Sequence, residues 1–131
     1  MKISTKSQYG LRAIVLLARN KDKIISLKDI SRKEGIPFDY LEKIISRMEK
    51  KQLVGSRKGV KGGYYLKKSP KKIKIGKVIE ALEGKMSLVK CIDRSYFCPH
   101  GKKCPTKNFW KKLQTSMENT LNSLTLDDLI N

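Results

Sequence analysis

The three cysteines of the chain, Cys91, Cys98 and Cys104, lie within fourteen consecutive positions, and the single histidine, His100, stands among them. Thiolates and imidazoles are the donors that proteins use for zinc and iron. The N-terminus has an apolar patch but no convincing signal-peptide cleavage site, so we expect a cytoplasmic protein with reduced thiols. An odd, tight group of thiols in that compartment indicates a metal site or a redox sensor rather than a disulfide framework.

The spacing C-x6-C-x5-C leaves the kind of metal open. Three cysteines and one histidine would complete a tetrahedral zinc site, but structural zinc sites favour cysteines paired two to four residues apart, and this chain has no such pair. Iron–sulfur clusters are also held by cysteine thiolates. From the residues alone, zinc and an iron–sulfur cluster are about equally compatible, and a redox dithiol without metal is the third alternative.

The charge of the chain indicates a polyanionic partner. Thirty basic residues stand against 12 acidic ones, which gives a formal net charge of +18, and residues 1–70 carry +12 of it. Such an excess is more than solubility requires. A lysine-rich solvated surface is the alternative. No apolar stretch approaches the roughly 20 residues that cross a bilayer, so we expect no membrane partner.

The elements that must position these groups begin with three helices. Apolar residues recur at helical spacing after Ser4, a second short helix starts at Ser26 and stops at Gly35, and a third follows Pro37 to about Lys51. Two helices joined by a glycine turn have the proportions of a helix-turn-helix, whose second helix reads the major groove. An ordinary helical hairpin is the alternative. The residues expected to contact DNA on the third helix are Phe38, Asp39, Tyr40, Glu42, Lys43 and Arg47.

The stretch GSRKGVKGGYYL predicts a β-hairpin with a basic tip. Its glycines suit the turn, and no nucleotide-binding motif of the G-x-G-x-x-G or GK[ST] kind accompanies them. We therefore expect Arg57, Lys58 and Lys61 to contact DNA as a wing, and Tyr64 and Tyr65 to pack in the strands.

The C-terminal part predicts one short helix, IGKVIEALEG, and one long helix that opens at Pro105. The apolar stripe of the long helix needs a cover, and packing on its own domain is one possibility. We expect instead pairing with a second subunit through Phe109, Trp110, Leu113, Met117 and Leu121. The fold class is mainly α with a small β-hairpin wing. We expect a winged helix-turn-helix domain over 1–84, a cysteine segment over 85–104, and a dimerisation helix with a C-terminal turn over 105–131. No nucleophile is paired with a base, so an enzyme is not expected.

Taken together, these stretches resemble the winged-helix regulators typified by the iron–sulfur cluster regulator IscR, with NsrR and CymR as relatives. The resemblance spans essentially the whole chain. It lies in STKSQYGLRAIVLLA, GIPFDYLEKIISRM, RKGVKGGYYL, IGKVIEALEG, the three cysteines, CPTKNFWKKL and LNSLTLDDLIN.

The resemblance implies that Cys91, Cys98 and Cys104 ligate a [2Fe–2S] cluster in a homodimer that binds a DNA operator. The histidine that gives the fourth ligand in the regulator of closest pattern corresponds to Lys107 here, so His100 is the candidate, with a merely solvated His100 as the alternative. The carboxylate ligand of NsrR-like relatives corresponds to Gln8, and Glu42 matches the family's discriminating acidic residue. The expected targets are iron–sulfur assembly genes. The alternatives are a nitric oxide or redox-responsive regulator, or a small basic nucleic-acid-binding protein with a structural zinc.

Overall fold

The computed structural model describes residues 2–92, 99 and 104–130. Helices dominate, and one antiparallel hairpin interrupts them, which confirms the expected fold class. In chain order the elements are α1 (Thr5–Arg19), α2 (Leu27–Glu34), α3 (Phe38–Lys50), β1 (Val54–Arg57), β2 (Gly63–Leu66), the 3-10 turn η1 (Pro70–Lys72), α4 (Ile75–Glu83), the 3-10 turn η2 (Lys90–Ile92), α5 (Lys107–Ser123) and α6 (Leu126–Ile130).

Local sequence signals set the boundaries of the first three helices. The Ser4 hydroxyl accepts a hydrogen bond from the Ser7 amide at 3.2 Å, and the Ser26 hydroxyl accepts one from the Asp29 amide at 3.1 Å. Each satisfies a backbone donor that the first turn of a helix leaves unpaired. Gly35 ends α2 in the left-handed conformation, with φ of 64°. The helix-turn-helix therefore forms where the sequence predicts it.

The core lies where α3 meets α1, α2 and α4. The buried stripe of α3 is the predicted one, Leu41, Ile44, Ile45 and Met48. Each of these side chains is at most 1% exposed. Full burial of an aliphatic side chain contributes roughly 1.5–3 kcal/mol, so this stripe holds α3 rigidly on the domain and leaves its opposite face free.

The hairpin has one face toward α3 and one face away from it. Ser56 pairs with Tyr64 across the two strands, and the Ser56 hydroxyl donates to Glu49 of α3 at 2.6 Å. Because side chains alternate along a strand, Gly55 and Arg57 belong to the other face, together with Tyr65. The Tyr65 ring lies over Gly55, where a Cβ would come within 2.6 Å of it. On its free edge, β2 pairs with Ile25 through an isolated bridge.

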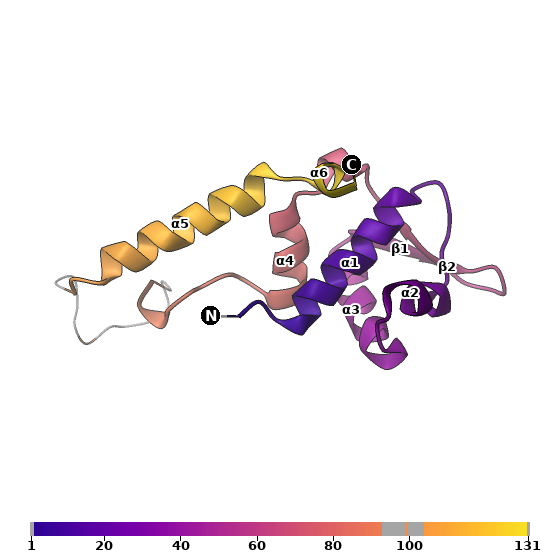
Figure 1. Ribbon diagram of the computed structural model, residues 1–131, viewed down its shortest axis with the longest axis horizontal. Coiled ribbons are helices and arrows are strands. Elements are labelled where there is room, and N and C mark those ends of the chain that lie inside the picture. Colours follow the sequence, from indigo (N-terminus) through magenta and orange to yellow (C-terminus); the bar gives the residue numbers. More distant parts are fainter. Residues whose placement is uncertain (1, 93–98, 100–103, 131) are drawn as a thin grey trace.

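The C-terminal helices leave the domain and return to it. Figure 1 shows α5 extending from the body of the molecule, while α6 lies back against the end of α1. The return is fixed by backbone hydrogen bonds from Ile75 to Leu124 at 2.9 Å and from Leu126 to Ile73 at 3.0 Å. Leu126 is fully buried. Among the described residues, no helix combines the length and apolarity needed to span a membrane.

Candidate nucleic-acid interface and cysteine segment

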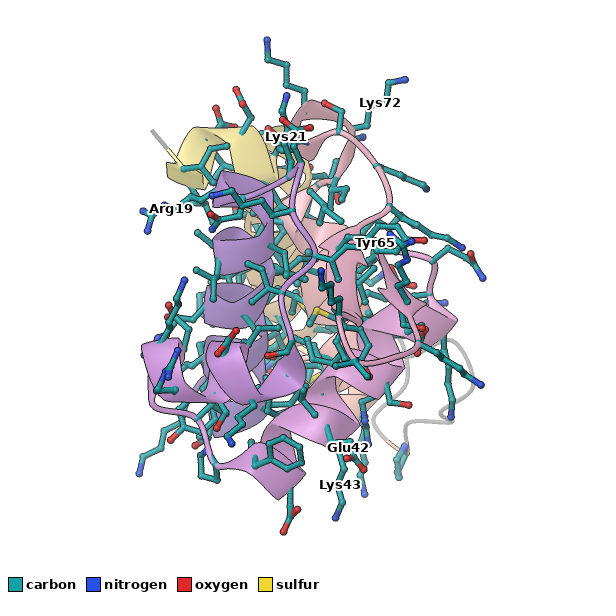
Figure 2. The ribbon with its side chains drawn as sticks, turned by 90° about the vertical axis from the view of Figure 1, so that its right-hand side faces the viewer. Arg19, Lys21, Glu42, Lys43, Tyr65 and Lys72 are labelled. Carbon is teal, nitrogen blue, oxygen red and sulfur yellow. The ribbon has the colours of Figure 1, made fainter. Side chains whose placement is uncertain are left out.

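The outward face of α3 is polar and open to solvent. All six residues predicted to contact DNA on this helix are exposed, and Phe38 keeps 46% of its surface accessible. Figure 2 shows Glu42 and Lys43 extending from the same end of the molecule, away from the core. An exposed helix face on a rigid core is what insertion into a major groove requires.

Two of the six residues also make contacts within the chain. The Tyr40 ring packs edge-to-face on Tyr9 of α1, with ring centroids 5.7 Å apart. Such pairs orient the ring and add about 0.5–1.5 kcal/mol. The Arg47 guanidinium donates to the Leu82 carbonyl of α4 at 3.1 Å. Arg47 thus connects α3 to α4 while remaining exposed.

The hairpin carries its three predicted cations into solvent. Arg57, Lys58 and Lys61 are exposed, and Val60 at the tip is fully accessible. Tyr64 sits on the inner face, where burial first and then the carboxylates of Glu49 and Glu42 raise the pKa of its phenol. Glu42 therefore lies within electrostatic reach of the hairpin, which places α3 and the wing as neighbours.

Two of the three thiols lie close to the start of α5. Cys91 is part of η2, which packs against α5, and Cys104 precedes the first turn of α5 by three residues. Both are free and half-buried. The side-chain hydrogen bond with Thr106, 3.3 Å from the sulfur, is the main cause that lowers the pKa of the Cys104 thiol. A lowered pKa favours the thiolate, which is the form that binds metals and reacts with oxidants.

Gln114 fastens the beginning of the cysteine segment to α5. Its side-chain oxygen accepts from the Leu88 amide at 3.1 Å, and its nitrogen donates to the Met86 carbonyl at 3.3 Å. Glu118, one turn further on, accepts from the same nitrogen at 3.0 Å. The chain between α4 and Cys91 is therefore held along α5 by one amide side chain.

The end of α4, residues 82–84, is bonded to two other helices. Glu83 accepts hydrogen bonds from the hydroxyls of Ser4 and Ser7, the latter at 2.6 Å, and Ser7 is only 1% exposed. The Leu82 carbonyl accepts the hydrogen bond from the Arg47 guanidinium. Gly84 then ends the helix with φ of 83°. The start of α1 and helix α3 are both bonded to the chain where the cysteine segment begins.

The apolar stripe of α5 is not buried by its own chain. No residue of α5 falls in the buried class, and Phe109 is 57% exposed. Trp110 stacks edge-to-face on Phe109, with centroids 4.8 Å apart. Leu113 and Met117 are half-buried, whereas Leu121 packs against the core beside α4. Leu121 is thus the member of the predicted dimerisation stripe that packs on the core, while Phe109 near the other end of the helix stays exposed.

The predicted metal ligands are only partly within the described residues. Cys91 and Cys104 are described, and Cys98 and His100 lie outside that part of the chain. Within the described ranges, no three histidine, cysteine or carboxylate side chains meet to form a metal site. Lys107 begins α5, and the Gln8 side chain donates to the Ile3 carbonyl at 2.9 Å.

Sequence reasoning did not anticipate Gln114, Glu83 or Ser7 as residues that position the site. Gln114 and Glu118 are one turn apart, a spacing that allows a side-chain pair, but the sequence does not indicate the Met86–Leu88 backbone as a third partner. Ser7 has a local role near the cap of α1, and its bond to Glu83 spans 76 positions. Sequence patterns that extend over a few residues do not indicate a contact between positions so far apart.

The sequence of this chain is similar to those of known transcriptional regulators over its whole length. A family model described as "Rrf2: Iron-dependent Transcriptional regulator" matches residues 3–131. The transcriptional regulator IscR of Pectobacterium carotovorum is 36% identical over 132 residues, which cover all of this chain and 80% of the relative.

Two solved structures extend the comparison to the fold. IscR of T. potens is 35% identical with a TM-score of 0.80, covering 99% of this chain and 86% of that one. CymR, the global cysteine regulator of B. subtilis, is 33% identical with a TM-score of 0.83, covering 99% and 96%. These relatives are regulators of transcription and not enzymes. The chain therefore belongs to the Rrf2 family of transcriptional regulators.

Proposed function

We propose that this chain is a DNA-binding transcriptional regulator whose affinity for its operator depends on a [2Fe–2S] cluster ligated by Cys91, Cys98 and Cys104. The observation that carries the proposal is the place of the cysteine segment. It joins the end of α4, which is bonded to the recognition helix through Arg47, to the start of α5. A change in this segment therefore acts close to the helix that reads DNA.

The described thiols suit such a group. Cys104 has a lowered pKa, and Cys91 is held beside α5 in a 3-10 turn. Soft thiolate donors are the usual ligands of iron–sulfur clusters. A bound cluster would supply a redox-active centre that is lost or altered when iron, oxygen or nitric oxide levels change. For the fourth ligand we retain His100, because a protonated Lys107 offers no lone pair.

Contacts within the chain connect the cysteine segment to the helix α3 that is proposed to bind DNA. Ligation of Cys91 and Cys104 restrains the two described cysteines, and the Gln114 bonds pass that restraint to residues 86–88. The end of α4 follows directly, with Glu83 bonded to α1 and Leu82 to Arg47. Loss of ligation removes this restraint, so the end of α4 changes position together with the Arg47 side chain that is bonded to the Leu82 carbonyl.

Two copies of the chain complete the regulator. The stripe with the exposed Phe109 and the half-buried Trp110, Leu113 and Met117 is covered by the same helix of a second subunit. A two-fold dimer then presents two copies of α3 and the wing to a pseudo-palindromic operator. Its targets are iron–sulfur assembly genes, and it acts in the cytoplasm on double-stranded DNA, without a membrane partner.

The test begins with protein purified without oxygen. We expect a brown protein with iron and inorganic sulfide in equal amounts, and a preferred duplex after selection from a random library. Removing the cluster should change the affinity for that duplex but not for competitor DNA. Any single replacement, Cys91→Ala, Cys98→Ala or Cys104→Ala, should abolish the chromophore. His100→Ala should retain a cluster with shifted absorption and faster loss in air, and an unaltered spectrum would remove His100 from the ligand set.

The lowered pKa of Cys104 favours one second candidate, a regulator that responds to oxidation of the thiols themselves. Colourless protein whose operator affinity changes reversibly with oxidant and reductant would support this candidate. Colourless protein with one zinc per chain and no preferred duplex would indicate instead a basic nucleic-acid-binding protein with a structural zinc.

A further inference from the structure

A second basic surface surrounds the connection between α1 and α2. Lys21 and Lys23 are exposed in this connection. Figure 2 shows Lys21 and Lys72 at the opposite end of the molecule from Glu42 and Lys43 of the recognition helix. These cations therefore do not belong to the face of α3 that reads the operator.

The first part of this surface is a cavity of about 400 Å³ beside the wing. Its walls come from the α1–α2 connection and from the outer face of the hairpin, and they include Lys21, Lys23, Arg57 and Tyr65. Arg57 belongs both to the basic wing and to this cavity. A polyanion that contacts the wing is therefore already at the edge of the cavity.

A second cavity, of about 450 Å³, lies on the other side of the same connection, against η1 and α6. Lys21 and Lys23 line it as well, so the two cavities form one continuous surface. Cations outnumber carboxylates along it; the charged residues are Arg19, Lys21, Lys23, Arg57 and Lys71 against Asp22 and Asp127.

The lysines of the connection are not neutralised by the carboxylates that the structure describes. In the described residues, the cations that form ion pairs are Arg12, Arg32 and Lys77, whose partners lie on helices. Like charges held close together in a folded chain repel one another, and a bound polyanion relieves that repulsion. The surface thus favours a ligand with closely spaced negative charges.

We propose that this surface binds the phosphate backbone of duplex DNA that flanks the operator, immediately outward from the wing. The inference rests on the proposed function, since α3 and the wing must first place the duplex. A duplex continues past the wing and carries a phosphate about every 3.4 Å along each strand. An acidic polypeptide needs buried apolar anchors for affinity, and the cavity beside the wing offers only Ile24 and Tyr65.

The experiment uses the selected operator in two lengths, measured over a range of KCl concentrations with the full chain. One duplex ends at the outer edge of the selected site, and the other adds about one helical turn, some 10 base pairs, on each side. Each phosphate neutralised adds about 0.9 to the slope of log K against log salt. We expect a steeper slope for the long duplex, and we expect Lys21→Gln/Lys23→Gln to lower it by up to about 2 per chain while leaving the short duplex unchanged.

The matched control is Lys111→Gln/Lys112→Gln, which removes the same charge from exposed positions on α5. This control should keep the difference between the two lengths. Equal slopes for the two lengths in the wild type, or an equal loss in the control variant, overturn the proposal. Binding of poly-glutamate, a model acidic polypeptide, is measured in parallel. If the two lengths give equal slopes and the Lys21→Gln/Lys23→Gln variant loses poly-glutamate binding, the proposal is also overturned and the surface is assigned to an acidic polypeptide. Failure of the short duplex to bind specifically refutes the proposed function instead.

Discussion

Replacement of Gln114 by alanine should release the beginning of the cysteine segment without unfolding the protein. The wild-type side chain holds the Leu88 amide and the Met86 carbonyl on α5 at 3.1 and 3.3 Å. Neither bond joins residues of the buried core, so the loss is local. Alanine is also the strongest helix former, so α5 itself should not be weakened by the change.

The magnitude follows from the two hydrogen bonds. Each contributes roughly 0.5–1.5 kcal/mol net, because water replaces it when the segment opens. The free energy of local opening should therefore fall by about 1–3 kcal/mol, which corresponds to exchange about 5- to 150-fold faster at that amide. Global stability, measured by urea denaturation, should change by much less than this.

Hydrogen exchange at the Leu88 amide measures the effect directly, because this amide is the donor to Gln114. Two-dimensional NMR of the metal-free protein gives its rate in the wild type and in Gln114→Ala. Asn119→Ala is the control, since it removes an exposed amide side chain from the same helix. Unchanged exchange at Leu88 in Gln114→Ala, or equal acceleration in the control, would refute the anchoring role. If the anchor matters for function, holo Gln114→Ala should also lose its chromophore faster in air.

Three further predictions concern the DNA interface and the core. Glu42→Ala should broaden the set of duplexes recovered by selection, because the carboxylate either accepts from cytosine or repels wrong sequences, and an identical set of sites argues against this role. Lys58→Ala should weaken binding to all duplexes and reduce the salt slope by about 0.9, measured by titration at several KCl concentrations; an unchanged slope would remove the wing tip from the interface. Leu126→Ala should destabilise the fold by about 2–5 kcal/mol in urea denaturation, since its side chain is fully buried, and a change below about 1 kcal/mol would mean that α6 does not complete the core.

The elements with local signals could be predicted from the sequence. Ser26 marks the start of α2 and Gly35 its end, because a cap and a left-handed residue are needed at those positions whatever the rest of the fold does. The stripe Leu41, Ile44, Ile45 and Met48 is equally local, since helical periodicity alone assigns it to the core. The hairpin could be predicted from its glycine-rich tip, which lies between two short runs that suit strands. These features depend on neighbours within a few residues.

The contacts that connect the elements could not be predicted in the same way. Arg47 was expected to face DNA, and its bond to the Leu82 carbonyl joins residues 35 positions apart. The sequence predicts a C-terminal turn where α6 lies, but it does not indicate that Leu126 is buried in the same core as α1 to α4. Hydroxyls, amides and guanidinium groups accept many partners, so their identity does not fix which partner the fold supplies.

The packing of α6 on the core determines when, during synthesis, the fold can be completed. Residues emerge from the ribosome in sequence order, so α1 to α4 are complete before Leu126 exists. The place that Leu126 fills in their core stays open until Leu126 has been synthesised. Cys91 and Cys104 both precede Leu126 in the chain, so both thiols are synthesised while this core is still incomplete. Any chain interrupted between residues 105 and 125 would carry its cysteines but lack the leucine that closes the core.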